Sequence, residues 1–196
     1  MQKLKREDLY MLEEYARVRP QFRDKVIAHK KNRRLQVGPN LTLTFEDRLT
    51  MQYQVQEMLR VERIFEIEGI QDELDAYNPL IPDGSNWKAT LLIEYPDVEE
   101  RRRALEQLKG VESRFWVRVA GQQPVWAIAD EDLERTNETK TSSVHFLRFE
   151  LTSEMAGAVR SGSGIAIGVD HESYRYTLDP ILPAVRESLA QDLHGA

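Results

Sequence analysis

The sequence predicts an α+β protein: a helical N-terminal half with a small hairpin, followed by a mainly antiparallel sheet with its helices on one face. Three observations support this prediction. Apolar residues recur at helical spacing through most of the first 79 residues. From residue 88 onward they alternate with polar residues, as in strands that bury one face. A strand, a capped helix, a glycine and a second strand occur twice there, which predicts two βαβ-like units in one ferredoxin-like sheet.

Two helices are expected at the amino terminus. The first covers residues 7–18, where apolar side chains fall on one face. Pro20 suits the first turn of the second helix, which we expect to reach Lys31. A basic run at 29–34 closes this second helix. Cations favour a helix C-terminus, so the run is either a solvated helix end or a site for an anion or nucleic acid.

A hairpin and a long helix follow. Residues 35–45 alternate around a Gly-Pro-Asn turn, which is typical of a short hairpin. Thr44 and Asp47 can then form a capping box in which aspartate replaces the usual glutamate. We expect the helix that starts there to end at Gly69, because glycine favours the left-handed conformation found after helix ends. A short helical turn is expected at 72–77.

The long helix carries charged residues inside its apolar stripes, Glu62 in one stripe and Arg60 in the other. Because burying an unpaired charge is costly, one hypothesis gives each charge a structural partner. The candidate partners of Glu62 are arginines of the amino-terminal helices: Arg17, Arg19 and Arg23. The second hypothesis is a polar binding pocket on this helix. It would be lined by Gln52, Gln56, Arg60 and Glu62.

Turn-forming residues at 78–86 mark a boundary between a helical region, residues 1–79, and an α+β sheet region, residues 80–196. We expect the two regions to form one integrated domain. Asp97 and Thr152 or Ser153 are the expected helix caps in the second region. Its expected elements are a strand at 88–95, a helix from 97 to 110, strands at 114–119, 125–129 and 143–151, a helix at 152–160, a strand at 164–169 and a terminal helix at 180–193.

The polar faces of the expected strands hold a candidate docking surface. Trp116 and Arg118 alternate with apolar residues on the 114–119 strand, and Arg148 lies on the 143–151 strand. Cross-strand ion pairs on a solvated face would explain most of these charges. Tryptophan and arginine are enriched at interface hot spots, so binding of a protein partner around Trp116, Arg118 and Arg148 is the alternative interpretation.

No cofactor is expected. The sequence contains no cysteine, which excludes disulfides, thiolate nucleophiles and iron–sulfur ligation by this chain. No predicted helix carries the Glu-x-x-His motif of di-iron sites. His145 shares a strand face with apolar residues, which favours a hydrogen-bonded core histidine over a catalytic one. Residues 170–172, Asp-His-Glu, resemble a metal-ligand triplet, but three adjacent side chains point at one ion only with special backbone geometry.

The composition also bounds the partners. The 27 Lys and Arg against 33 Asp and Glu give a formal net charge of −6, which argues against nucleic acid or an anionic membrane as the main partner. No apolar run approaches the ~20 residues that span a bilayer, and the amino terminus lacks the apolar core of a signal peptide. We therefore expect a soluble cytoplasmic protein without a membrane partner. A homo-oligomer is compatible with these features.

Three segments resemble an uncharacterised bacterial family, the domain of unknown function 3501: residues 45–60, Asn78 to Pro82, and Val144 to Phe149. The likeness extends over nearly the whole chain. Genes of this family often lie beside those for a rubrerythrin-like protein and an iron–sulfur oxidoreductase. The resemblance therefore implies a place in a redox or peroxide-stress module.

These observations lead to two hypotheses about function. The first is a non-enzymatic accessory or protein-binding protein of that module, which contacts the rubrerythrin-like protein or the iron–sulfur oxidoreductase through the strand face around Trp116. The second is a small-molecule or anion-binding sensor, or an enzyme, that uses the polar pocket on the long helix. The absence of a nucleophile–base or metal constellation in the sequence favours the first hypothesis.

Overall fold

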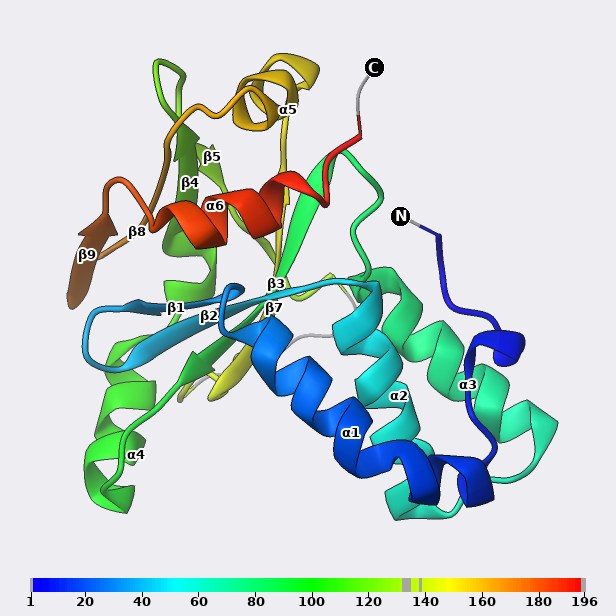
Figure 1. The fold of residues 1–196 in the computed structure, drawn as a ribbon. Coiled ribbons are helices and arrows are strands. Elements are labelled where there is room, and N and C mark those ends of the chain that lie inside the picture. The colour runs from blue at the N-terminus through cyan, green and yellow to red at the C-terminus, as the bar shows by residue number, and fades with distance from the viewer. Residues whose placement is uncertain (1, 132–134, 138, 195–196) are drawn as a thin grey trace.

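The computed structural model describes residues 2–131, 135–137 and 139–194, which form an α+β fold with two antiparallel sheets (Figure 1). The five-stranded sheet has the order β1 (Arg34–Val37), β2 (Leu41–Glu46), β3 (Asn86–Ile93), β7 (Val144–Glu150) and β6 (Ile128–Ala129). The four-stranded sheet has the order β5 (Val125–Trp126), β4 (Phe115–Val119), β8 (Ile165–His171) and β9 (Tyr174–Leu178). The α+β class is therefore confirmed, but the single ferredoxin-like sheet is not what the chain forms.

Six α-helices are present in the described part of the chain: α1 (Leu12–Lys30), α2 (Arg48–Glu62), α3 (Ile67–Tyr77), α4 (Val98–Gln107), α5 (Ser153–Arg160) and α6 (Pro183–Ala190). Short 3-10 turns lie at Arg6–Asp8, Asn78–Leu80 and Val111–Arg114. Figure 1 shows α1, α2 and α3 grouped on one side of the sheets, whereas α4, α5 and α6 lie around the strands. None of these helices combines the length and apolar character needed to cross a bilayer.

The two strand–helix–strand units pass from one sheet to the other. The first runs β3–α4–β4 and the second runs β7–α5–β8, so each begins in the five-stranded sheet and ends in the four-stranded sheet. The strands alternate as predicted: Phe115, Val117 and Val119 are buried, and the residues between them are half-buried. Alternation shows that one face of a strand is buried, but it does not show which sheet the strand joins.

The two sheets share one hydrophobic core. Phe45 and Phe149 of the five-stranded sheet belong to the same buried cluster as Phe115 and Ile167 of the four-stranded sheet. The rings of Phe45 and Phe149 lie 6.3 Å apart between centroids. The apolar faces of the two sheets therefore cover each other, and the predicted arrangement of one sheet with its helices on a single face is wrong.

The hairpin predicted at 35–45 is present as β1 and β2, but it is part of the large sheet. Strand β2 pairs with β3 over six residues, with Leu43 opposite Leu91. The N-terminal region is therefore not only helical. The boundary expected between residues 79 and 80 separates two strands that are hydrogen-bonded neighbours.

The first two predicted helices are one helix. Helix α1 runs from Leu12 to Lys30 with Pro20 in its interior, so a helix start at Pro20 is wrong. Proline has no N–H, and the hydrogen bond to the carbonyl four residues earlier is lost. Tyr15, Phe22 and Val26 are buried on one stripe that crosses the proline, and this packing keeps the helix continuous.

The single helix predicted over 44–69 is also wrong. Thr44 lies in β2, and the capping box forms three residues later. There Asp47 Oδ1 accepts a hydrogen bond from the Thr50 N–H, and Thr50 Oγ1 accepts one from the Asp47 N–H, both at 2.9 Å. Helix α2 ends at Glu62 because Arg63 adopts the left-handed conformation with φ 55°. Gly69 and the turn expected at 72–77 are both part of α3.

Candidate functional site

The glutamines of α2 hold the segment that precedes α1. Gln56 is fully buried: its Oε1 accepts a hydrogen bond from the Tyr10 N–H at 2.5 Å, and its Nε2 donates to the Tyr10 carbonyl at 3.3 Å. Gln52 Nε2 donates to the Asp8 carbonyl at 2.6 Å. Both side chains therefore satisfy backbone groups of the segment before α1, which is a structural use of residues proposed for a binding pocket.

Glu62 is exposed, so the expectation that it is buried with an arginine partner is wrong. Arg60 is exposed too, and it pairs with Glu57 one turn earlier at 3.2 Å. Helix α2 ends at Glu62, so the apolar stripe that was expected to bury this carboxylate does not continue past it. Phe65, expected on the same stripe, lies in the connection to α3 and is 61% exposed.

An arginine of α1 does pair with a glutamate of α2, but the glutamate is Glu57. Arg19 donates from Nε and Nη2 to the two oxygens of Glu57, at 2.7 and 2.8 Å, and the Tyr15 hydroxyl donates to the same carboxylate at 2.7 Å. The hydrogen bonds from Arg19 lower the pKa of Glu57 to about 2. This ion pair fixes α1 against α2. The four residues proposed for a pocket thus do not converge on one: Gln52 and Gln56 bind the segment before α1, Arg60 pairs with Glu57, and Glu62 is exposed.

Trp116 lies on the solvent-facing side of the four-stranded sheet. Its cross-strand neighbours are Trp126 on β5 and Gly168 on β8. A Cβ atom at Gly168 would lie 2.3 Å from Trp116 Cζ2, so the indole lies directly over the glycine. The Arg118 guanidinium is 5.7 Å from the centre of the indole and donates to Asp179 Oδ2 at 2.6 Å. The indole is thus held in place by neighbours on the same face.

Arg148 belongs to the other sheet, and 22% of its side chain is exposed. Its cross-strand partner is Ile128 on β6, and Ile128 is two residues from Trp126. Trp126 and Ile128 are 45% and 41% exposed. We call Trp116, Arg118, Trp126, Ile128 and Arg148 the tryptophan strip. Arg148 also donates to Glu131 and Glu150 at 2.7 and 2.5 Å, and these hydrogen bonds, first that to Glu131, raise its pKa.

His145 is a fully buried, hydrogen-bonded core histidine, as the sequence predicts. Its Nδ1 lies 2.5 Å from Asp130 Oδ2, and its Nε2 lies 2.9 Å from Thr141 Oγ1. A carboxylate, an imidazole and a hydroxyl in this order resemble a catalytic triad. Thr141 is only 1% exposed, however, so in this conformation its hydroxyl does not reach a substrate.

His171 is also held by hydrogen bonds. Its Nε2 lies 3.1 Å from the Lys109 carbonyl, and its Nδ1 accepts from the Ser173 N–H at 3.2 Å. Both ring nitrogens are therefore engaged, which leaves neither free for the metal triplet considered at 170–172. Within the described ranges, no group of three or more histidine, aspartate or glutamate side chains is arranged to hold a metal ion.

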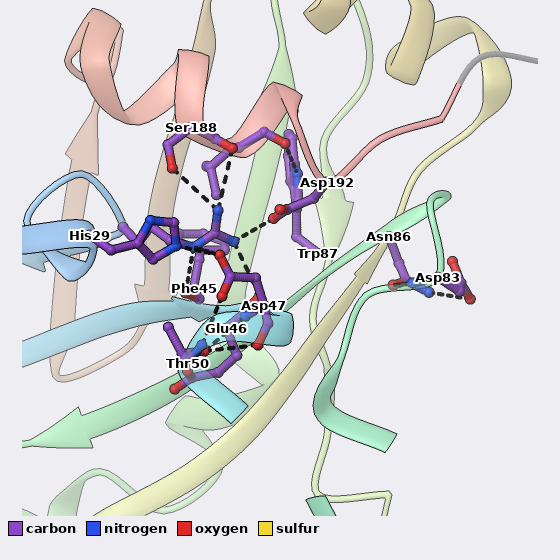
Figure 2. A network of polar contacts seen from close by, with 12 residues as sticks. His29, Phe45, Glu46, Asp47, Thr50, Asp83, Asn86, Trp87, Ser188 and Asp192 are labelled. Atoms are coloured by element: carbon purple, nitrogen blue, oxygen red, sulfur yellow. Dashed lines mark hydrogen bonds and ion pairs between the residues drawn. The ribbon is translucent and has the colours of Figure 1, made fainter. Parts of the chain in front are cut away.

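A buried charge network around Arg33 was not predicted (Figure 2). Arg33 is 1% exposed, so the interpretation of the whole run 29–34 as a solvated helix end is wrong at this residue. Its guanidinium donates to the carbonyls of Phe45 and Glu46, at 2.9 and 3.1 Å, and to Asp192 Oδ2 at 2.5 Å. Asp47 Oδ2 lies 3.3 Å from its Nε. The network joins the end of α1, the start of α2 and the end of the chain.

The two aspartates of this network differ in their acidity. Burial raises the pKa of Asp192 to about 6, although Arg33 opposes this shift. Burial also disfavours ionisation of Asp47, but the charge of Arg33, the Thr50 amide and His29 together outweigh it and lower its pKa. Among the described residues, Asp192 Oδ1 and Glu46 Oε2 are buried without a hydrogen-bond partner. Asp47 is thus ionised near neutral pH, whereas Asp192 is close to its titration point.

His29 connects this network to the surface. Its Nε2 lies 2.5 Å from Asp47 Oδ2, and its side chain is 29% exposed. A hollow of about 250 Å³ lies beside it, lined by His29, Asn32, Ala184, Glu187, Ser188 and Gln191. Nε2 is the ring nitrogen that faces Asp47, so this side of the imidazole is occupied by the ion-pair contact. The hollow is lined mostly by polar side chains and suits a small polar ligand.

Comparison with known proteins places the chain in a family. The family model described as "Protein of unknown function (DUF3501)" matches residues 3–193. No curated protein matches the chain. A solved structure from Burkholderia pseudomallei, described as a novel protein of unknown function, is 52% identical; the match covers 98% of this chain and 100% of that one, with a TM-score of 0.94. The chain therefore belongs to the family of proteins of unknown function DUF3501.

Proposed function

We propose that this protein is a non-enzymatic accessory protein that binds a protein partner through the tryptophan strip. The observation that carries this proposal is the cross-strand pair of tryptophans, the half-buried Trp116 and the 45% exposed Trp126. Tryptophan and arginine dominate interface hot spots because they bury a large area and also form directed polar contacts. The strip offers both residue types, with Trp126 and Ile128 exposed and Trp116, Arg118 and Arg148 half-buried.

The strip is also preorganised. The Trp116 indole lies over Gly168, and Arg118 is tethered to Asp179 by a hydrogen bond of 2.6 Å. Side chains that are already fixed lose little rotational freedom when a partner binds, so more of the contact free energy appears as affinity. A loose surface tryptophan would lack this advantage.

The kind of partner follows from the family resemblance. It implies a bacterial redox or peroxide-stress module, with a rubrerythrin-like protein or an iron–sulfur oxidoreductase as the partner. A cytoplasmic location is part of the same proposal. The tryptophan strip is the surface that would contact this partner.

Binding to the two partners tests the proposal. We expect measurable binding of the wild-type chain to one of them. Trp116→Ala and Trp126→Ala should each weaken this binding by about tenfold or more. Val98→Ala is the matched control, because Val98 is 62% exposed on α4, away from the strip. Circular dichroism would confirm that each variant is folded. No binding to either protein under oxidising and reducing conditions, or equal binding by all variants, would contradict the proposal.

A second candidate function is a small-molecule or anion-binding sensor, or an enzyme, and His29 is the residue that favours it. The long-helix residues proposed for this role have the separate surroundings described above, whereas His29 and its buried partner Asp47 border a polar hollow. A thermal-shift panel of anions and metabolites tests this function. A ligand that stabilises the wild type but not His29→Ala would support it, by the linkage between binding and folding. If no ligand raises the melting temperature of either protein, this candidate function is contradicted.

A further inference from the structure

An apolar groove of about 510 Å³ lies between the segment before α1 and the α2–α3 connection. Its apolar walls are Leu9, Leu12, Leu59, Ile64, Phe65 and Ile70. The volume falls in the range of ~300–1,000 Å³ that is usual for ligand sites. This groove is separate from the tryptophan strip, since the strip lies on β4 to β7.

Exposed apolar side chains surround the groove. Met11 and Phe65 line it and are 73% and 61% exposed, and Val61 and Ile67 on either side of the α2–α3 connection are 63% and 56% exposed. The left-handed turn at Arg63 ends α2, so Phe65 lies in the connection to α3 and not on the helix. Exposed apolar groups that gather in one place mark an interaction site more often than scattered ones do.

Two of the three charged residues that line the groove are acidic. Glu7 and Glu13 line it, with Arg6 as the opposing charge. Glu62 lies one helical turn from Leu59 on α2, and Glu73 lies one turn from Ile70 on α3, so each shares a helix face with a residue that lines the groove.

These α2 and α3 carboxylates are close enough to affect one another. Burial, and then the negative charges of Glu62 and Asp72, raise the pKa of Glu73. Of the nearby arginines of α2 and its C-cap, Arg60 pairs with Glu57, and Arg63 is exposed. A partner that brings positive charge would relieve the repulsion among these carboxylates.

The surroundings of the groove favour a helical occupant. An extended peptide would need free backbone groups to pair with, as a sheet edge provides. Here the walls are helices and the segment at Tyr10, and the Tyr10 N–H and carbonyl are both bound by Gln56. A helix satisfies its own backbone groups and needs only an apolar groove for its side chains.

We propose that this groove binds a basic amphipathic helix of a protein partner. The apolar side of that helix would pack against Leu59, Ile64 and Phe65, and its lysines or arginines would face Glu7, Glu13 and the carboxylates of α2 and α3. This interaction does not depend on the tryptophan strip. The chain thus has two independent docking surfaces, one on the helices and one on the sheets.

Fluorescence anisotropy with designed peptides tests the inference. The probe is a labelled peptide of leucine and lysine in the spacing of an amphipathic helix, and the comparisons are a peptide of the same composition in scrambled order and a leucine–glutamate peptide in the helical spacing. We expect the basic helical peptide to bind at least about tenfold more tightly than either comparison. Binding should weaken as salt is added, because exposed charges are screened.

Variants of the groove complete the test. Phe65→Ser and the double variant Glu7→Lys/Glu13→Lys should each weaken binding about tenfold or more, whereas Val98→Ser should bind like the wild type. These exposed positions tolerate substitution, and circular dichroism would verify the fold. Equal binding by Phe65→Ser, or by the scrambled peptide, would overturn the inference. So would self-association in sedimentation experiments that Phe65→Ser abolishes, since a second copy of the chain would then be the occupant.

Discussion

At the scale of single residues, Arg33 is a buried charge that connects distant parts of the chain. Its guanidinium contacts two carbonyls, Asp47 and Asp192, and its Nη1 also lies 3.3 Å from the Ser188 carbonyl and hydroxyl. A planar guanidinium with five donors can serve so many acceptors at once, and an ammonium group cannot. Nothing in the sequence marks this residue, since it stands inside a basic run whose other members are at the surface or half-buried.

Removing this arginine should strongly destabilise the fold. Arg33→Met would leave the buried carboxylates of Asp47 and Asp192 without their counter-ion, and breaking a buried pair in this way costs about 3 kcal/mol or more. Arg33→Lys should recover only part of the loss, because lysine lacks the fork. Urea melts of the variants would measure both effects. Arg34→Ala is the control, with 54% of the side chain exposed, and should stay within ~0.5 kcal/mol of wild type.

Asp192 should make stability depend on pH in an unusual direction. Its folded-state pKa of about 6 lies above the ordinary value of 3.8, so folding favours the protonated form. The stabilising contribution is complete below pH ~4 and is lost as pH rises through about 6. Asp192→Asn should remove this dependence, so the wild type should lose on the order of 2 kcal/mol relative to the variant between pH 4 and 7.

The measurement is a series of urea melts of both proteins from pH 4 to 7. Asp47 does not obscure the result, because its pKa is lowered and its contribution is lost only on acidification below the ordinary aspartate value of 3.8. A wild type that gains stability relative to Asp192→Asn as pH rises to 7 would show that Arg33, and not burial, sets the acidity of Asp192.

At the scale of elements, the helix caps predicted in the second half of the chain are confirmed, whereas the Thr44 cap, the Pro20 helix start and the Gly69 helix end are wrong. Asp97 caps α4 by accepting from the Glu100 N–H at 2.8 Å, and Thr152 caps α5 by accepting from the Met155 N–H at 3.2 Å. The end of α2 has no such signal, because Arg63 is not one of the residues that favour the left-handed conformation. Apolar residues keep helical spacing from α2 into α3, so the sequence pattern predicts one helix although the chain forms two.

Arg63→Gly distinguishes the two arrangements by the sign of its effect. In the structure Arg63 has φ 55°, a conformation that glycine adopts without strain, so the substitution should stabilise the protein by up to about 1 kcal/mol. In the interior of one continuous helix the same substitution would destabilise it by about 1 kcal/mol. Arg60→Gly, within α2, is the control and should destabilise. Thermal melts of both variants against wild type would decide the matter.

The same scale explains which parts of the site could be predicted. Trp116 and Arg118 were found because they alternate with buried residues on one strand. Trp126 and Ile128 alternate in the same way, and their exposure could have been predicted by extending that argument to 125–129. Gln56 could not have been assigned, because its partner Tyr10 is 46 residues away in the sequence. A contact at that separation leaves no local pattern.

At the scale of the whole molecule, the sequence predicts the faces of the strands but not the sheets that they join. Strand β9 was missed, although its pairing with β8 over five residues completes the four-stranded sheet. The alternation of β3 and of β4 would be the same in one sheet or in two. The arrangement in two sheets depends on the common core, to which the strands contribute residues from 35 to 174. Such long-range packing is decided by volume and shape, which a periodic pattern does not contain.

The same connections predict how the chain unfolds. Strand β2, from the region before residue 79, pairs with β3 from the region after it, and Arg33 at the end of α1 is bound to Asp192 near the end of the chain. The helices α1 and α2 therefore lose their supports when the sheets unfold. We expect a single cooperative transition, with one denaturant midpoint for all probes.

Hydrogen exchange followed by mass spectrometry across a urea series would test this expectation. Amides of α1 and α2 and amides of β3 and β8 should become exposed at the same urea concentration, because their protection derives from one global unfolding reaction. Arg33→Met should lower that concentration for both groups together. If the helices instead exchange well before the strands in the wild type, the helical region is a separate unit, and the links through β2 and Arg33 are too weak to couple it to the sheets.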